Sequence, residues 1–244
     1  LRALVAPFAD EHVGAVGGEL VLTAQPETGA IGQGCGLYWR YEKAIRASEG
    51  SVDSTVGATG AIYAIRRELF EPIPSDTILD DVAIPMHVAR RGFRVVFEPR
   101  ARAFDRPPAS ALEEFTRKVR TLAGNFQLLA REPWLLLPWR DRLWFQVLSH
   151  KALRLLGPLL LAGAFLASLA LIADPLYAFA LLCQSAFYAA AGAGALLRNA
   201  PFRPRLFAVP YTFCLLNAAT AVAFWRWMRG QQRVTWARAS ARRG

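Results

Sequence analysis

The sequence predicts an α/β domain followed by a transmembrane α-helical region. Up to about residue 150, charged and apolar residues are mixed, and segments with strand character alternate with segments with helix character. Beyond Ala152 the chain consists of three long apolar stretches separated by short polar joints. Hydrophobic residues make up 54% of the 244 residues and the mean hydropathy is +0.22, which is high for a soluble protein. This excess lies in the second part of the chain.

Three segments of the first part predict β-strands. Residues 12–23 alternate in polarity and are rich in Val and Leu, which is typical of a strand. Residues 56–70 form a Gly-rich turn that runs into an apolar strand. Residues 94–99 predict a compact strand that we expect to close at Pro99.

Three other segments predict helices. Residues 36–50 place their apolar side chains on one helical face. A short helix is expected from Val82 to Arg91, ended by a glycine. The helix over 110–132 has Ser110 as its expected N-cap and Glu113 three residues later, which together form a capping box.

The second part predicts membrane segments. The Trp, Pro and Arg content of residues 133–154 is typical of an amphipathic segment in the membrane surface. Residues 155–173 and 175–197 are apolar and about long enough to cross a bilayer. Residues 206–225 are also long enough, but they contain three residues that fit a span less well: Pro210, Asn217 and Thr220. This third stretch would be a span, a re-entrant segment or a buried helix.

The net charge of +10 would fit a nucleic-acid-binding protein, but the distribution of the basic residues argues against this interpretation. They flank the apolar stretches and fill the tail over 229–244, as at cytoplasmic membrane edges. We therefore expect membrane lipids and no nucleic acid as partners. The joint at Asp174 has no basic residue and is expected outside. Three crossings would place the basic tail outside too, so either the third stretch does not cross or the tail is an exception.

The cysteines and histidines predict neither a metal site nor a disulfide framework. Cys35, Cys183 and Cys214 lack metal-site spacing, and the three histidines are scattered. This composition fits a cytoplasmic location for the first domain.

Residues suited to group transfer follow one another in the chain. A Gly-rich turn allows close approach to the backbone, an acidic pair can supply a general base, and a basic helix can neutralise a diphosphate. In chain order these are Gly57 and Gly60, then Asp80 and Asp81, then Arg117, Lys118 and Arg120.

Each feature also has a purely structural interpretation. Asp80 or Asp81 would simply cap the helix that follows, with Pro85 near its first turn. The basic residues would form a solvated or lipid-facing surface. The glycine pair would only make a turn.

Three segments together carry a family resemblance. The stretches "GATGAIYAIRRELF", "LDDVAIPMHVARRGFRVVFEP" and "RKVRTLAGNFQLL" resemble the C-terminal half of membrane-bound family 2 glycosyltransferases, which include cellulose, chitin, hyaluronan and poly-N-acetylglucosamine synthases. The resemblance covers most of residues 1–130. It implies that residues 1–132 are part of a GT-A domain, that 133–154 is interfacial, and that 155–228 is the transmembrane region.

The resemblance also implies roles for individual residues. Asp81 corresponds to the general base of an inverting transfer and Asp80 to its acidic neighbour. Arg120 matches the arginine of the family motif Gln-x-x-Arg-Trp, which lines the diphosphate and the acceptor end of the site, and Lys118 would assist it. Arg117 replaces the glutamine of that motif, and Thr121 replaces its tryptophan, which removes a stacking platform for an acceptor sugar. Thr59, Gly60 and Ala61 would form the wall nearest the acceptor.

The donor side of such a site is expected upstream of Leu1. The family binds its nucleotide and a divalent metal, Mg or Mn, through aspartates that include an Asp-x-Asp motif, and this sequence contains no Asp-x-Asp. The resemblance therefore implies a fragment that is inactive alone, from an inner-membrane enzyme that transfers sugar from a nucleotide-diphosphate sugar such as a UDP-sugar. The acceptor would be a glycan or a lipid-linked group. Transfer of a single sugar to a lipid carrier, and a non-catalytic membrane protein, remain alternatives.

Overall fold

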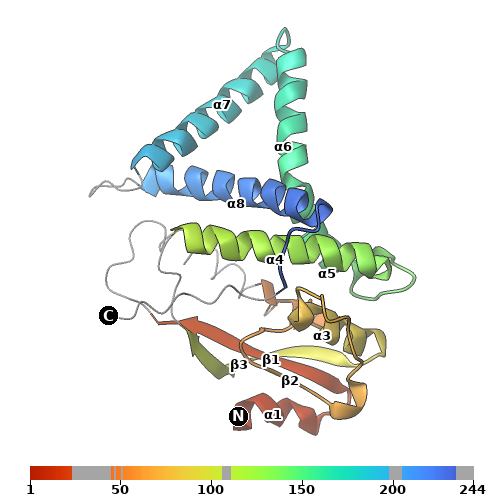
Figure 1. Cartoon of the computed structure of the whole chain (residues 1–244). Coiled ribbons are helices and arrows are strands. Elements are labelled where there is room, and N and C mark those ends of the chain that lie inside the picture. The colour runs from red at the N-terminus through yellow and green to blue at the C-terminus, as the bar shows by residue number, and fades with distance from the viewer. Residues whose placement is uncertain (24–44, 47, 51, 106–110, 198–204, 235–244) are drawn as a thin grey trace.

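The computed structural model describes residues 1–23, 45–46, 48–50, 52–105, 111–197 and 205–234. These residues form a small mixed β-sheet with helices, followed by three long apolar helices (Figure 1). The predicted order of a mixed α/β part and an apolar helical part is confirmed.

The sheet contains three strands in the order β2-β1-β3. The central strand β1 (Val13–Leu22) pairs antiparallel with β2 (Tyr63–Ile65) and parallel with β3 (Arg94–Asp105). Each predicted strand is therefore present. The first half of β1 is fully buried, as expected of a central strand covered on both faces.

The third strand is longer than the sequence predicted, because β3 does not end at Pro99. The ladder shifts register between Gly18 and Glu19 of β1, and residues 99–101 bulge out opposite this step. A bulge accommodates a proline, which has no N–H to donate. A side chain at Gly18 would lie 2.3 Å from the carbonyl oxygen of Ala101, so the bulge needs a glycine beneath it.

Helices cover both faces of the sheet. On one face lies α1 (Arg2–Val5), whose Leu4 packs against Val13 and Val16 of β1. On the other lies α3 (Asp80–Arg90), whose Met86 and Val88 pack with residues of β1 and β3 (Figure 1).

Two predicted helices lie partly outside the described residues. Residues 45–46 and 48–50 are helical, but the rest of the expected helix over 36–50 is not described. The helix expected over 110–132 is α4 (Ala111–Arg131). Its proposed cap Ser110 lies outside the described residues.

A compact connection leads from α4 to the apolar helices. It contains the short helices η3 (Pro133–Leu136) and α5 (Trp144–Val147) and a π-helical turn, η4 (Leu148–Ala152), which continues into α6 (Leu153–Ala170). The connection buries four apolar residues in the core beside α3: Trp134, Leu135, Leu143 and Val147. Trp139 and Phe145 remain exposed, so the segment is amphipathic, and its location in the membrane surface stays a prediction.

Three helices are long and apolar enough to cross a membrane. They are α6, α7 (Pro175–Leu196) and α8 (Arg205–Met228). The last part of the connection and α6 form one continuous helix over Trp144–Ala170. Asp174 caps α7 by accepting the Leu176 N–H at 2.8 Å. These lengths and compositions support a multi-pass membrane protein.

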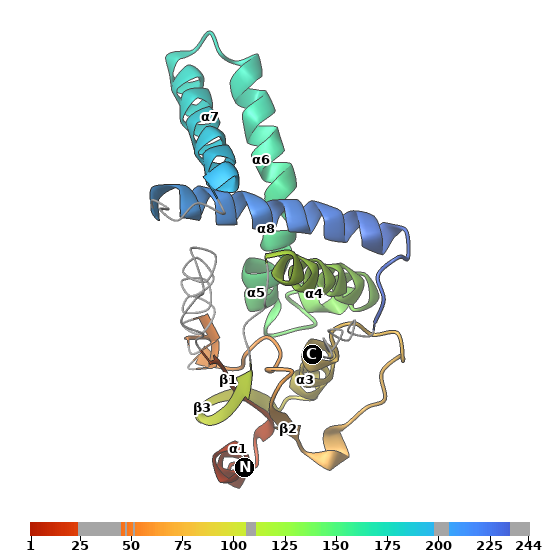
Figure 2. The same ribbon diagram turned by 60° about the vertical axis from the view of Figure 1, so that its left-hand side comes forward.

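The third apolar helix lies differently from the other two. In both views α6 and α7 rise away from the sheet, whereas α8 crosses beneath them and runs alongside α4 (Figures 1 and 2). Ala219 and Ala223 of α8 pack against Val119 and Ala123 of α4. After α8, Val234 packs against the core of the sheet domain. The end of α8 therefore lies on the same side as the sheet.

Candidate active site

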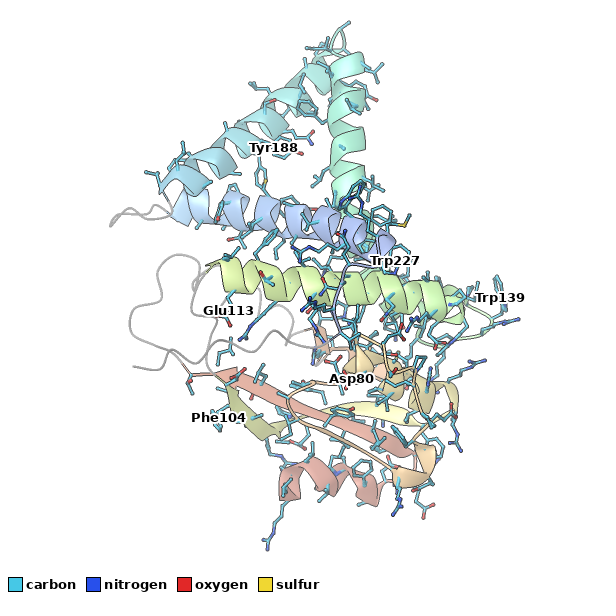
Figure 3. All side chains as sticks on the ribbon, viewed as in Figure 1. Asp80, Phe104, Glu113, Trp139, Tyr188 and Trp227 are labelled. Carbon is cyan, nitrogen blue, oxygen red and sulfur yellow. The ribbon has the colours of Figure 1, made fainter. Side chains whose placement is uncertain are left out.

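The acidic pair occupies the first turn of α3, in the space between α4 and the sheet (Figure 3). The residue at the N-cap is Leu79, and the structure gives it no side-chain cap hydrogen bond. The prediction that Asp80 or Asp81 caps this helix is therefore wrong. Asp80 is exposed and Asp81 is partly buried, so both carboxylates are left for another role.

A proline explains how the pair is joined to the Gly-rich turn. Pro85 lies well inside α3, contrary to the expected place in its first turn. Since proline has no N–H, the carbonyl of Asp81, four residues earlier, lacks its usual helical donor. The backbone N–H of Ala58 donates to that carbonyl at 2.8 Å. Pro85 thus leaves the Asp81 carbonyl without a helical donor, and the Gly-rich turn is hydrogen-bonded to α3 at this carbonyl.

Both glycines of the turn lie so close to Asp81 that a side chain would not fit at either position. Gly57 has φ of +91°, which disfavours a side chain, and its open side faces the backbone of Asp81 and Val82. A Cβ at Gly60 would lie 2.8 Å from Oδ2 of Asp81. The turn therefore lies directly against the Asp81 carboxylate.

The other expected wall residues have different environments. The Thr59 hydroxyl donates to the Gly18 carbonyl at 2.6 Å and accepts from Arg46 at 2.8 Å, so it joins the turn to β1. Ala61 is exposed in the turn that the Ile62 N–H closes onto the Thr59 carbonyl at 2.9 Å.

One face of α4 holds the segment that leads into the acidic pair. Gln127 accepts the Ile78 N–H and donates to the Asp76 carbonyl, both at 2.9 Å. Gly124 lies so close that an added Cβ would be 2.5 Å from Leu79. Such spacing along a helix places these side chains on one face. The helix therefore fixes the residues immediately before Asp80.

The electrostatic surroundings of Asp81 combine burial with several cations. Burial raises the pKa of Asp81 and outweighs the other influences. The charge of Lys151 acts most strongly against it and lowers the pKa, Asp80 raises it, and Arg46 and Arg120 lower it. Desolvation therefore disfavours the ionised form of this carboxylate, and the cations favour it. A group of this kind is a candidate general base.

The cations come from three separate parts of the chain. Arg120 is on α4, Lys151 lies in the π-helical turn below α6, and Arg46 belongs to the segment before the Gly-rich turn. Burial, followed by the charges of Asp80 and Asp81, raises the pKa of the Tyr63 phenol on β2, so this group also faces the pair.

Arg120 of the basic motif reaches the site. Its guanidinium donates to the carbonyls of Ile78 at 3.2 Å and of Val234 at 2.7 Å. Burial lowers the pKa of Arg120, while Asp81 and Asp80 oppose this shift. The arginine therefore joins α4, the acidic pair and the segment after α8.

The other residues of the motif have different partners. Arg117 pairs with Glu113 at 2.7 Å along the same helix, as in the structural interpretation of the basic face. The exposed Thr121 donates its hydroxyl to the Arg117 carbonyl at 3.1 Å. Lys118 is partly buried.

Sequence reasoning missed Tyr63, Arg46 and Lys151. Tyr63 lies within a segment that carried the family resemblance, and its polar ring in an apolar strand was an available signal. Arg46 and Lys151 lie far from Asp81 in sequence, and no local pattern connects them to it.

The described residues do not form a metal site. They contain no group of three or more His, Cys, Asp or Glu side chains that could hold a metal ion. The acidic pair faces cations, which would compete with a metal. No part of the chemistry below is assigned to a metal held by these residues.

A scan against protein-family models and a search of curated proteins find no match to this sequence.

Proposed function

We propose that this chain belongs to a membrane-bound inverting glycosyltransferase of the family 2 type, in which Asp81 is the general base. The domain over residues 1–132 would be part of a GT-A fold. The described residues would supply the acceptor side of the site. The donor would be a nucleotide-diphosphate sugar, and the acceptor a glycan or a lipid-linked group at the cytoplasmic face of the membrane.

The observation that carries this proposal is the environment of Asp81. A partly buried carboxylate with a raised pKa lies against a glycine turn, with Lys151, Arg46 and Arg120 nearby. The carboxylate can accept the proton of an acceptor hydroxyl as that oxygen attacks the anomeric carbon. The cations can neutralise the departing diphosphate. The same cations lower the pKa of Asp81 against the effect of burial and so favour the ionised form that a base needs.

The glycine turn suits the approach of an acceptor. Gly60 and Ala61 are exposed and present no bulky side chain beside Oδ2 of Asp81. An acceptor hydroxyl can therefore approach the carboxylate across the backbone of this turn. The site lies below the foot of α6, where a membrane-bound acceptor would arrive.

Thr121 favours a single transfer over polymerisation. The residue is exposed, and its hydroxyl is bonded to its own helix. No aromatic ring at this position can hold a growing sugar chain by stacking. The same catalytic pair would then act once on each lipid-linked acceptor.

The test is Asp81→Asn in the full-length membrane protein. Asn has nearly the same shape, and the Asp81 side chain does not cap α3, so the fold should persist. We expect the rate of nucleotide release from UDP-glucose or UDP-N-acetylglucosamine, with native membranes as acceptor, to fall by about 10²–10⁴-fold. Because ionising a carboxylate of raised pKa costs folding free energy, the variant should be at least as stable as the parent at neutral pH.

Asp53→Asn provides the matched control. Asp53 pairs with Arg142 at 2.6 Å and is not among the charges that act on Asp81, so its replacement should leave the rate unchanged. Sugar transfer that persists in Asp81→Asn at the parent rate would rule out the general-base assignment. If the parent turns over no UDP-sugar, the donor class is wrong.

A further inference from the structure

A buried histidine–glutamate contact joins the foot of the first apolar helix to the sheet domain. His150, in the π-helical turn η4, approaches Glu49 with 2.9 Å between Nδ1 and Oε1. The side chains are only 5% and 7% exposed. Burying two ionisable groups is costly, and an apolar pair would often stabilise a fold as well. The pair therefore calls for an explanation other than stability.

Glu49 extends this contact to the catalytic candidate. Its second oxygen accepts the Val56 N–H at 3.2 Å, at the start of the Gly-rich turn. Two residues later the Ala58 N–H donates to the Asp81 carbonyl at 2.8 Å. A continuous path thus runs from His150 through Glu49 and the turn to Asp81.

The π-helical turn is what directs His150 inward. A π turn contains an extra residue and changes which side chains face a neighbour, and such turns occur often at functional sites. Here His150 is buried and Lys151, the next residue, is partly buried. The membrane helix thereby presents adjacent polar residues to the domain below it.

We propose that His150 is a positioning residue, which acts through Glu49 to hold the Gly57–Ala61 turn against Asp81. This inference rests on the proposed function of Asp81 as the general base. Through the contact of His150 with Glu49, the position of α6 sets the geometry of the site. The Gly57–Ala61 turn, which faces the acceptor in the proposed function, is thereby fixed to the helix along which a membrane-bound acceptor arrives.

The experiment compares His150→Leu with His150→Asn in the full-length protein. Leucine removes the hydrogen bond to Glu49, whereas the asparagine amide can replace the Nδ1 donor. For His150→Leu we expect a fall in kcat of tenfold or more with the donor KM unchanged, and faster hydrogen exchange at the amides of residues 56–61. His150→Asn should recover kcat to within about threefold of the parent.

A second His–Glu pair is available as a control. His87 on α3 approaches Glu132 at 3.1 Å, and none of the hydrogen bonds of this pair among the described residues involves residues 56–61. His87→Leu should lower thermal stability without changing kcat or the exchange of residues 56–61. A double variant, His150→Leu with Glu49→Leu, should be no slower than either single variant, because both act through one link.

The outcomes separate this inference from the proposed function. Unchanged exchange at residues 56–61 in His150→Leu would overturn the link, and an unchanged kcat would overturn its use in catalysis. If Asp81→Asn keeps its activity, the proposed function fails and the catalytic use of the link fails with it. The exchange experiment still decides whether the link exists.

Discussion

At the scale of single residues, Asp81 is governed by opposing effects. Burial raises its pKa, the nearby cations lower it, and the first outweighs the second. A base must be ionised when the acceptor binds, yet a stronger base removes a proton more readily. In the proposed mechanism, the charge of Lys151 would therefore help to set the pH at which Asp81 acts as a base.

Removing that charge should move the pH profile. In Lys151→Gln the pKa of Asp81 should rise further, so the acidic limb of kcat/KM should shift to higher pH and activity should recover in alkaline buffer. The folded pKa lies above the unfolded one, so stability falls as pH rises between the two values, and the variant should widen this window. The profile is measured from nucleotide release over pH 5 to 9.

The control for this shift is Arg140→Gln. Arg140 is an exposed arginine in the same connection between α4 and α6, and it is not among the charges that act on Asp81. Its replacement should leave the profile in place. An equal shift in both variants would mean that net charge, rather than Lys151, sets the pKa.

At the scale of elements, α4 joins the two parts of the protein. One face holds residues 76–79 ahead of the acidic pair, and another face packs on α8 through residues such as Val119 and Ala123. Phe126 stacks with Trp227 near the end of α8, with ring centroids 5.8 Å apart (Figure 3). We therefore expect a movement of α8 to displace α4 and, with it, the residues before Asp80.

Gly124 is the closest contact of α4 with that segment. In Gly124→Ala the new methyl would meet the side chains of Leu79 at 2.5 Å and of Ile78 at 2.9 Å, so these residues or the helix must shift. We expect a loss of about 1–3 kcal/mol in the free energy of unfolding, as for other overpacked cores. The displacement next to Asp80 should also lower kcat. Thermal unfolding in detergent and nucleotide release measure the two effects.

Gly192→Ala in α7 is the matched substitution. An added Cβ at Gly192 has no neighbour within 4 Å, and alanine favours a helix by about 1 kcal/mol relative to glycine. It should keep or raise stability and leave kcat unchanged. A neutral result at Gly124 would show that α4 does not hold the acidic pair in place.

At the scale of the molecule, the structure bears on the conflict between charge and topology. Three crossings would place the basic tail outside, but the Arg120 guanidinium holds the Val234 carbonyl at 2.7 Å. The chain after α8 thus returns to the sheet domain. With α8 alongside α4, two crossings by α6 and α7 satisfy the preference for basic residues on the cytoplasmic side (Figure 2).

Labelling of single cysteines tests this arrangement. In a cysteine-free background, Ala173→Cys in the joint between α6 and α7 should react with a membrane-impermeant maleimide added outside spheroplasts. Gln231→Cys, which follows α8, should react only after permeabilisation. Ser75→Cys in the sheet domain should behave like Gln231→Cys. Labelling at position 231 from outside would mean that α8 crosses the membrane.

Local sequence patterns were sufficient for the order of elements. Alternation predicted β1, and length and apolarity predicted α6 and α7, because each property belongs to a segment of consecutive residues. The pattern also led to Asp81, Gly60 and Arg120, which the structure brings together. It was wrong where packing decides: β3 continues past Pro99 through a bulge, and neither aspartate caps α3.

The sequence by itself determined that an acidic pair begins a short helix after a glycine turn, and that apolar helices follow. Only the tertiary structure decided that Arg46 and Lys151 join Arg120 among the charges that act on Asp81, because their spacing in the sequence carries no information about contact. It also decided that His150 reaches Glu49 and that α8 lies along α4. Such contacts depend on how the elements pack, as does the burial of Asp81 that raises the pKa on which the proposed chemistry depends.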